Sequence, residues 1–262
     1  MKTKFKIGIT EYGDPGEDFS WIDYLKAVEF AVVISKAANE QFEDMLLKNK
    51  DRIIYHATCT GLGGTAIEDG VPTSTEKFQH LKRLLDRGFP AKQIVLRVDP
   101  LFPLSWVPVL NKVFQIDYPQ KLMNILTMTE SFGIKRVRYS YLDVYKFSLK
   151  KLQKISKDFI LPKDWMPVYE NELQLDKVKP DLEYEACNEL YVPKEHKIPC
   201  ISEKDLKIMG LDKTHKLDFP KANKAMQICG CPSNKLELML GRELRCNFDC
   251  KYCYWKDDRA VL

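Results

Sequence analysis

RIIYHATC at residues 52–59 and QIVLRVD at residues 93–99 are short apolar runs rich in β-branched residues, and each predicts a β-strand. The segment between them has a capping-box spacing, then apolar residues recurring on one helical face, then a glycine stop. These signals are Thr73 and Glu76, then Phe78, Leu81 and Leu85, then Gly88. Strand, helix and strand in this order predict a βαβ unit with parallel strands.

The same alternation extends over the first 160 residues. Further strands are predicted at Phe5–Glu11, Phe30–Lys36, Arg136–Asp143 and Leu182–Cys187. Further helices are predicted after Asp117, after Ser148 and over Glu203–Met209. Five or six strands are fewer than the eight of a closed barrel. The sequence therefore predicts an α/β fold, with a partial (β/α) barrel over residues 1–160 and a cysteine-rich region over 161–262 that completes the barrel and binds metal clusters.

The composition is that of a soluble globular protein, with 262 residues, 45% hydrophobic and 30% charged. The formal net charge of +4 is spread over interspersed charges, which is compatible with an anionic substrate but does not require nucleic acid. The N-terminus has no apolar stretch long enough for a signal peptide or a membrane span. We therefore expect a cytoplasmic protein that does not associate with a membrane.

Seven of the eight cysteines lie between residues 187 and 253, and in a reducing compartment such thiols bind metal or react more often than they form disulfides. RCNFDCKYCYW at 245–255 places Cys246, Cys250 and Cys253 in a C-x3-C-x2-C array. Such a loop can wrap three thiolates around a cubane [4Fe–4S] cluster and leave one iron open. The alternative is a zinc ribbon or knuckle, with Cys229 or Cys231 as the fourth thiolate.

The array resembles the signature of the radical S-adenosylmethionine superfamily, with Tyr252 before the third cysteine and Tyr254 and Trp255 after it. The resemblance implies that the open iron chelates the amino and carboxylate groups of S-adenosylmethionine and that Tyr252 lies near the adenine. It also implies reductive cleavage of the S–C5′ bond to a 5′-deoxyadenosyl radical, which abstracts hydrogen from the substrate.

Members of that superfamily carry the motif near the N-terminus, after the first barrel strand. In this chain it follows all the predicted strands, so the barrel would be permuted in order. ISKAAN (34–39), YHATCTGLGGTAIEDGVP (55–72), VLRVDP (95–100) and RYSYLDVY (138–145) resemble an uncharacterised bacterial and phage family distantly related to spore photoproduct lyase. That likeness suggests a nucleobase or nucleotide as the otherwise unidentified substrate, and the chemistry implies an external electron donor such as flavodoxin or ferredoxin.

Four further cysteines are enough for a second, closed site: Cys187, Cys200, Cys229 and Cys231. An auxiliary iron–sulfur cluster is the first expectation and zinc the second. The remaining alternative is that some of them are buried apolar thiols, because free cysteine is among the most buried residue types.

Polar residues at the carboxyl ends of parallel strands are the other candidate site residues. Lys36 and His56 are candidates for cofactor binding; Arg97, Asp99, Ser140 and Asp143 are candidates for catalysis, and Thr58 belongs to the same set. Arg97 and Asp99 point to one face of their strand, either lining a polar cavity or forming a structural salt bridge.

Cys59 ends the third predicted strand. By the likeness to spore photoproduct lyase it would be a hydrogen-donating thiol facing the substrate, and otherwise a core residue. The glycine-rich run TGLGGTAIEDG (60–70) lacks the P-loop and dinucleotide patterns, so we expect a mobile loop over the site.

The leading functional hypothesis is a radical S-adenosylmethionine enzyme. The competing class is a non-enzymatic zinc or iron–sulfur module for nucleic-acid binding or electron transfer. A third hypothesis is a metal-dependent enzyme that uses the polar residues of the strands without S-adenosylmethionine.

Overall fold

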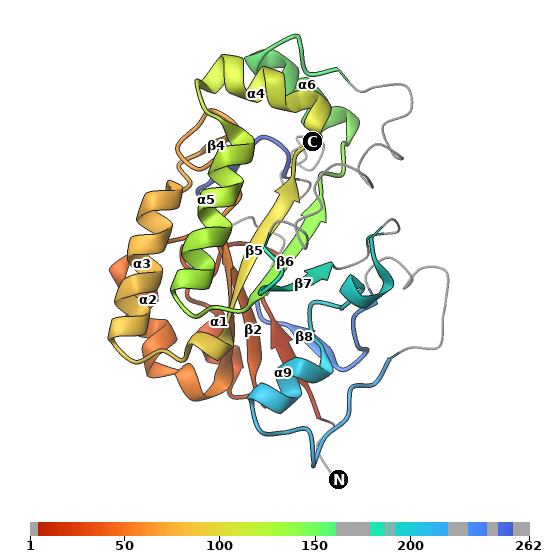
Figure 1. The fold of residues 1–262 in the computed structure, drawn as a ribbon. Coiled ribbons are helices and arrows are strands. Elements are labelled where there is room, and N and C mark those ends of the chain that lie inside the picture. Colours follow the sequence, from red (N-terminus) through yellow and green to blue (C-terminus); the bar gives the residue numbers. More distant parts are fainter. Residues whose placement is uncertain are drawn as a thin grey trace.

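The structure is a computed structural model that describes residues 5–160, 179–186, 189, 192–219, 230–239 and 246–253. Seven parallel strands form one sheet in the order β7-β6-β5-β3-β2-β1-β8 (Figure 1). They are β1 (Ile7–Ile9), β2 (Ala31–Ser35), β3 (Ile53–Thr58), β5 (Ile94–Leu101), β6 (Arg136–Tyr141), β7 (Glu183–Ala186) and β8 (Lys235–Glu237). A separate antiparallel pair joins β4 (Glu68–Asp69) to β9 (Asp249–Cys250).

The α-helices in the described residues are α1 (Trp21–Leu25), α2 (Glu40–Lys48), α3 (Ser74–Asp86), α4 (Val107–Phe114), α5 (Tyr118–Ser131), α6 (Lys146–Ile155) and α9 (Glu203–Ile208). Short 3-10 helices cover Lys50–Arg52, Ala91–Gln93, Leu104–Trp106 and Lys194–His196. No helix in the described ranges has the length and apolar character needed to cross a lipid bilayer.

From β1 to β7 the strands of the large sheet lie in chain order, so the sheet grows in one direction. A doubly wound fold would reverse direction partway. Because parallel crossovers share one hand, an unreversed order places the connecting helices on the same face of the sheet. The prediction of a parallel α/β sheet is confirmed. The edge strands β7 and β8 show no pairing with each other in the described residues, so closure into a barrel is not seen there.

The C-terminal region supplies both edges of the sheet. β7 pairs with β6 through Arg136 and Glu183, and β8 pairs with β1 through Ile7 and Lys235. The sequence did not predict β8, because its three residues, KLE, are too few and too polar to show a strand pattern. Residues 1–160 and the C-terminal region therefore share one sheet.

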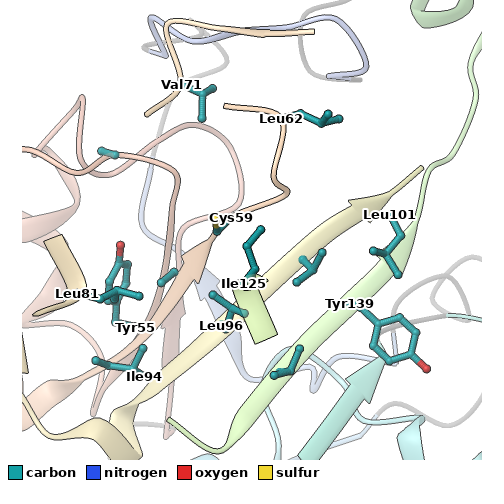
Figure 2. Close-up of a cluster of buried hydrophobic side chains, with 14 of the residues drawn as sticks. Tyr55, Cys59, Leu62, Val71, Leu81, Ile94, Leu96, Leu101, Ile125 and Tyr139 are labelled. Atoms are coloured by element: carbon teal, nitrogen blue, oxygen red, sulfur yellow. The ribbon is translucent and has the colours of Figure 1, made fainter. Parts of the chain in front are cut away.

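Alternate residues of each strand pack into two different cores, as the period of two requires. In β3, Tyr55 and Ala57 belong to the larger core, to which the helices from α1 to α6 contribute residues. Figure 2 shows Tyr55 among the side chains of this core. Ile54 belongs to a second core on the opposite face, where Cys200, Ile201, Leu206 and Cys231 cover the sheet. The C-terminal region therefore covers the face that the helices leave open.

The predicted capping box of α3 is confirmed, because the Thr73 side chain accepts from the Glu76 backbone N–H and the Glu76 carboxylate accepts from the Thr73 N–H. α5 follows Asp117 as predicted, and α6 begins at Lys146, before its predicted start after Ser148. The helices α1, α2 and α4 were not predicted.

Candidate functional site

A cavity of about 240 Å³ lies at the carboxyl ends of β1, β2, β3 and β5. This is the edge at which parallel α/β proteins hold their ligands. Polar side chains from the strand ends line one side, among them Thr10, Ser35 and Thr58. The loop that carries the motif cysteines, residues 246–253, lines the other side and is called the cysteine loop below.

The cysteine loop is attached to the glycine-rich segment by backbone hydrogen bonds. Glu68 pairs with Cys250 in the β4–β9 ladder, and the Lys251 N–H donates to the Ile67 carbonyl at 2.9 Å. Ile67 is fully buried. A mobile loop over the site was expected, but no residue of the glycine-rich segment lines the cavity. The segment buries Leu62 and Ile67 in the core and supports the cysteine loop through these backbone bonds.

Three polar side chains connect the cysteine loop to the sheet. The Lys36 ammonium lies 2.8 Å from a Glu68 carboxylate oxygen and 2.9 Å from the Tyr252 hydroxyl, which itself donates to Glu68. Burial favours the neutral amine of Lys36, but the charge and hydrogen bond of Glu68, together with smaller contributions from Cys250 and Asp99, outweigh it. The pKa of Lys36 therefore rises above its ordinary value. Burial, followed by the charge of Glu68, raises the pKa of the Tyr252 hydroxyl. Both side chains therefore keep their protons at neutral pH.

All three motif cysteines line the cavity. Cys250 is buried, and Cys246 and Cys253 are half-buried. Burial, with a smaller contribution from the charge of Glu68, raises the pKa of Cys250 to about 12, although the Lys36 ammonium opposes the shift. An uncoordinated Cys250 would therefore remain a neutral thiol, and metal binding would have to displace its proton.

The spacing of these sulfurs bears on the kind of metal site they could form. Around one tetrahedral metal with bonds of about 2.3 Å, two thiolate sulfurs lie about 3.8 Å apart. Thiolates on three different irons of a cubane are farther apart. In the described residues one group of three metal-ligand atoms lies mutually within 4.8 Å, and the motif cysteines are not that group. At least two of the three motif sulfurs therefore lie more than 4.8 Å apart.

The predicted pair Arg97 and Asp99 lines the cavity and is also an ion pair, so both interpretations offered by the sequence hold. Ser140 donates to Asp99 and does not line the cavity itself. Asp143 is exposed and also lies outside the lining, although burial and the charge of Asp99 raise its pKa. Of the four candidate catalytic residues on these strand ends, Arg97 and Asp99 face the cavity.

Two predicted site residues lie inside the protein instead. Cys59 is in the larger core, near Leu96 and Ile125, and does not line the cavity (Figure 2). Burial raises its pKa, so the thiol is protonated. The core interpretation of Cys59 fits this position better than a thiol facing the substrate. His56 is fully buried within β3 and also lies outside the cavity lining, unlike Lys36 and Thr58.

Two of the four cysteines predicted to form a second site lie together. Cys200 and Cys231 are both buried, and their sulfurs and a carboxylate oxygen of Glu11 lie mutually within 4.8 Å. Cys187 and Cys229 lie outside the described residues, as do Tyr254 and Trp255 of the motif.

Sequence reasoning missed Glu11 and Glu68. Glu11 was placed inside a predicted strand, and Glu68 within the supposed mobile loop. The sequence did contain a hint that Glu68 is buried, because it follows the apolar Ile67 in the glycine-rich run. Lys36 and Tyr252 are side chains that could pair with its carboxylate. Only the fold shows that these three side chains meet.

No curated protein and no solved structure matches this chain. One family model, described as a domain of unknown function (DUF1848), matches residues 4–255. That match includes the sheet, the cavity and the cysteine loop, so the chain belongs to the DUF1848 family.

Proposed function

We propose that this protein is a radical S-adenosylmethionine enzyme, in which Cys246, Cys250 and Cys253 hold a [4Fe–4S] cluster and the adjoining cavity receives S-adenosylmethionine and the substrate. The observation that carries the proposal is that all three thiols line one cavity at the carboxyl ends of the strands. Among the described lining residues there is no further cysteine or histidine.

The strand order supports a permuted partial barrel. If β8 is counted as the first strand, the sheet runs β8, β1, β2, β3, β5, β6, β7 without interruption. The cysteine loop then follows the first strand of the sheet, which is where the superfamily that this chain resembles carries its motif. The late position of the motif in the sequence is thus compatible with an ordinary position in space.

When bound, the cluster supplies the electron for reductive cleavage of S-adenosylmethionine to a 5′-deoxyadenosyl radical. The protein's own residues hold the site in place. Lys36 and Glu68 fix Tyr252, and the β4–β9 ladder fixes Cys250. Thr10 and Thr58 offer hydroxyls to a polar ligand, and the Arg97–Asp99 pair offers a charged group of each sign.

The substrate class suggested by the family likeness is a nucleobase or nucleotide, and an external donor such as flavodoxin or ferredoxin would deliver the electron. Both belong to the proposal, as does a cytoplasmic location, where reducing conditions keep the thiols free.

The test is anaerobic reconstitution of the whole protein with iron and sulfide. We expect about four iron atoms per chain at the motif, and 5′-deoxyadenosine on addition of dithionite and S-adenosylmethionine. Cys250→Ala should lose this iron and form no 5′-deoxyadenosine. Cys59→Ala is the matched control, a buried cysteine away from the cavity, and should keep its iron.

Zinc without iron at the motif cysteines would contradict the proposal and favour the non-enzymatic metal module. A reconstituted cluster that forms no 5′-deoxyadenosine on reduction, and no complex with S-adenosylmethionine by calorimetry, would favour an electron carrier. Formation of 5′-deoxyadenosine by the Cys250→Ala variant would also overturn the assignment.

A further inference from the structure

A second group of potential metal ligands lies on the sheet face opposite the helices. The sulfurs of Cys200 and Cys231 and a carboxylate oxygen of Glu11 lie mutually within 4.8 Å. The two thiols come from segments separated by thirty residues and are not joined in a disulfide. No other group of three in the described ranges meets this spacing. The ligand atoms around one tetrahedral metal ion lie about 3.8 Å from one another. The thiolate sulfurs that bind different irons of a cubane cluster lie farther apart.

The surrounding charges suit a bound divalent cation. Two thiolates and one carboxylate with a divalent ion leave one net negative charge. A guanidinium nitrogen of Arg97 lies 3.7 Å from the Cys200 sulfur, and the Lys235 ammonium lies 2.9 Å from a Glu11 carboxylate oxygen. Cations that contact metal ligands in this way orient them and stabilise their charged forms.

A third observation comes from His56. Its side chain is fully buried on the same sheet face as Ile54, which packs in one core with Cys200 and Cys231. Neither ring nitrogen has a hydrogen-bond partner among the described residues. A buried imidazole without a partner among the described residues therefore lies on the sheet face that holds the two thiols.

We propose that Glu11, Cys200 and Cys231 bind one zinc ion. Thiolate ligands select zinc over magnesium or calcium, and the close spacing selects one ion over a cluster. Glu11 also lines the main cavity, so the ion would stand at the cavity wall. The site shares no ligand with the cysteine loop and does not rest on the proposed function.

The experiment measures zinc and iron per chain in the anaerobically purified whole protein. We expect one zinc in the wild type. The Cys200→Ser/Cys231→Ser variant should lose this zinc and keep the motif iron. A variant with all three motif cysteines changed to serine should keep the zinc and lose the iron. Cys59→Ala, the matched buried cysteine, should keep both metals.

Zinc X-ray absorption of the wild type supplies a test that does not depend on any variant folding. The expected first shell has two sulfurs, with oxygen or nitrogen atoms as the other ligands. Four sulfurs would overturn the proposed ligand set. Loss of about four irons in the Cys200→Ser/Cys231→Ser variant would show a second cluster instead. A Cys200–Cys231 disulfide in anaerobically alkylated protein would likewise overturn the proposal, as would a wild type without zinc that binds none on titration.

Discussion

Glu68 joins the cysteine loop to the rest of the protein in two ways. Its backbone pairs with Cys250, and its carboxylate contacts both Lys36 and the Tyr252 hydroxyl. The side chain is about 1% exposed, so these contacts are made away from water, where an unpaired charge is costly. This residue therefore connects the strand-end lysine to the motif tyrosine.

We expect Glu68→Gln to loosen the cysteine loop, because Lys36 would lose the charge of its carboxylate partner in a buried setting. The loss should be about 2 kcal/mol in the free energy of unfolding, with faster hydrogen exchange over residues 249–253 and less iron after reconstitution. Asp69→Asn is the control, because Asp69 is exposed in the same ladder. Equal effects of the two substitutions would contradict the role of the buried carboxylate.

Lys77 is a fully buried lysine on α3. Its ammonium donates to the Ala37 carbonyl and lies 3.3 Å from the Tyr55 hydroxyl. Burial lowers its pKa from 10.5 to about 8, although Asp14 and Cys59 oppose the shift. The folded state therefore carries the cost of a buried charge below pH 8, and this cost disappears toward pH 10.5, where the unfolded chain also loses the proton.

Lys77→Met should remove this pH dependence. Wild-type stability relative to the variant should rise between about pH 8 and pH 10.5, by roughly 2–3 kcal/mol. Denaturant unfolding of both proteins across that range measures the difference, and the hydrogen bonds lost in the variant contribute only a constant offset. A difference that stays flat with pH would show that Lys77 is not titrating in the folded state.

At the scale of elements, the path of the glycine-rich segment depends on the close approach of Gly63 to the Pro72 backbone. A Cβ on Gly63 would lie 2.0 Å from the Pro72 carbonyl oxygen, which is a backbone atom and cannot rotate away. The segment therefore folds back tightly before α3, and this places β4 beside β9. Glycine is required there for the space it leaves.

Gly63→Ala should destabilise the protein by about 3 kcal/mol and reduce iron retention, because the β4–β9 ladder would be displaced. Thermal unfolding and iron analysis measure the two effects. Gly13→Ala is the comparison, because its Cβ would meet only the flexible end of Met239. An unchanged melting temperature for Gly63→Ala would mean that the segment rearranges without affecting the ladder.

At the scale of the whole molecule, a buried ion network attaches the C-terminal region to the sheet. Arg136 on β6 forms a bidentate pair with Glu185 on β7, at 2.8 and 3.1 Å, and reaches Asp205 on α9 at 2.7 Å. Arg138 contacts the same Glu185 carboxylate. Two guanidinium groups and two carboxylates balance in charge, so removal of one member leaves a buried charge uncompensated.

Glu185→Gln should therefore cost about 3 kcal/mol or more in the free energy of unfolding. The control is Glu183→Gln in the same strand, where the side chain is 55% exposed and a surface pair contributes little. Chemical denaturation measures both. Loss of the same stability in the two variants would show that the network does not hold β7 to the sheet.

Six of the seven strands in the large sheet, and the helices α3, α5, α6 and α9, could be predicted from local pattern. These elements are predictable because their signals span only a few residues each. The signals are the apolar runs, the Thr73 capping box and the glycine stops. The strands β4, β8 and β9 could not be predicted, because each has two or three residues and forms only where a distant partner pairs with it.

The sequence by itself determined the parallel α/β class and the C-x3-C-x2-C array, because both depend on residues close together in the chain. Only the tertiary structure decided which side chains meet. It brought Lys36, Glu68 and Tyr252 together, placed Cys59 in the core, and set Glu11 beside Cys200 and Cys231. These contacts join segments up to about two hundred residues apart, and their formation depends on burial and charge pairing, which no local pattern of residues encodes.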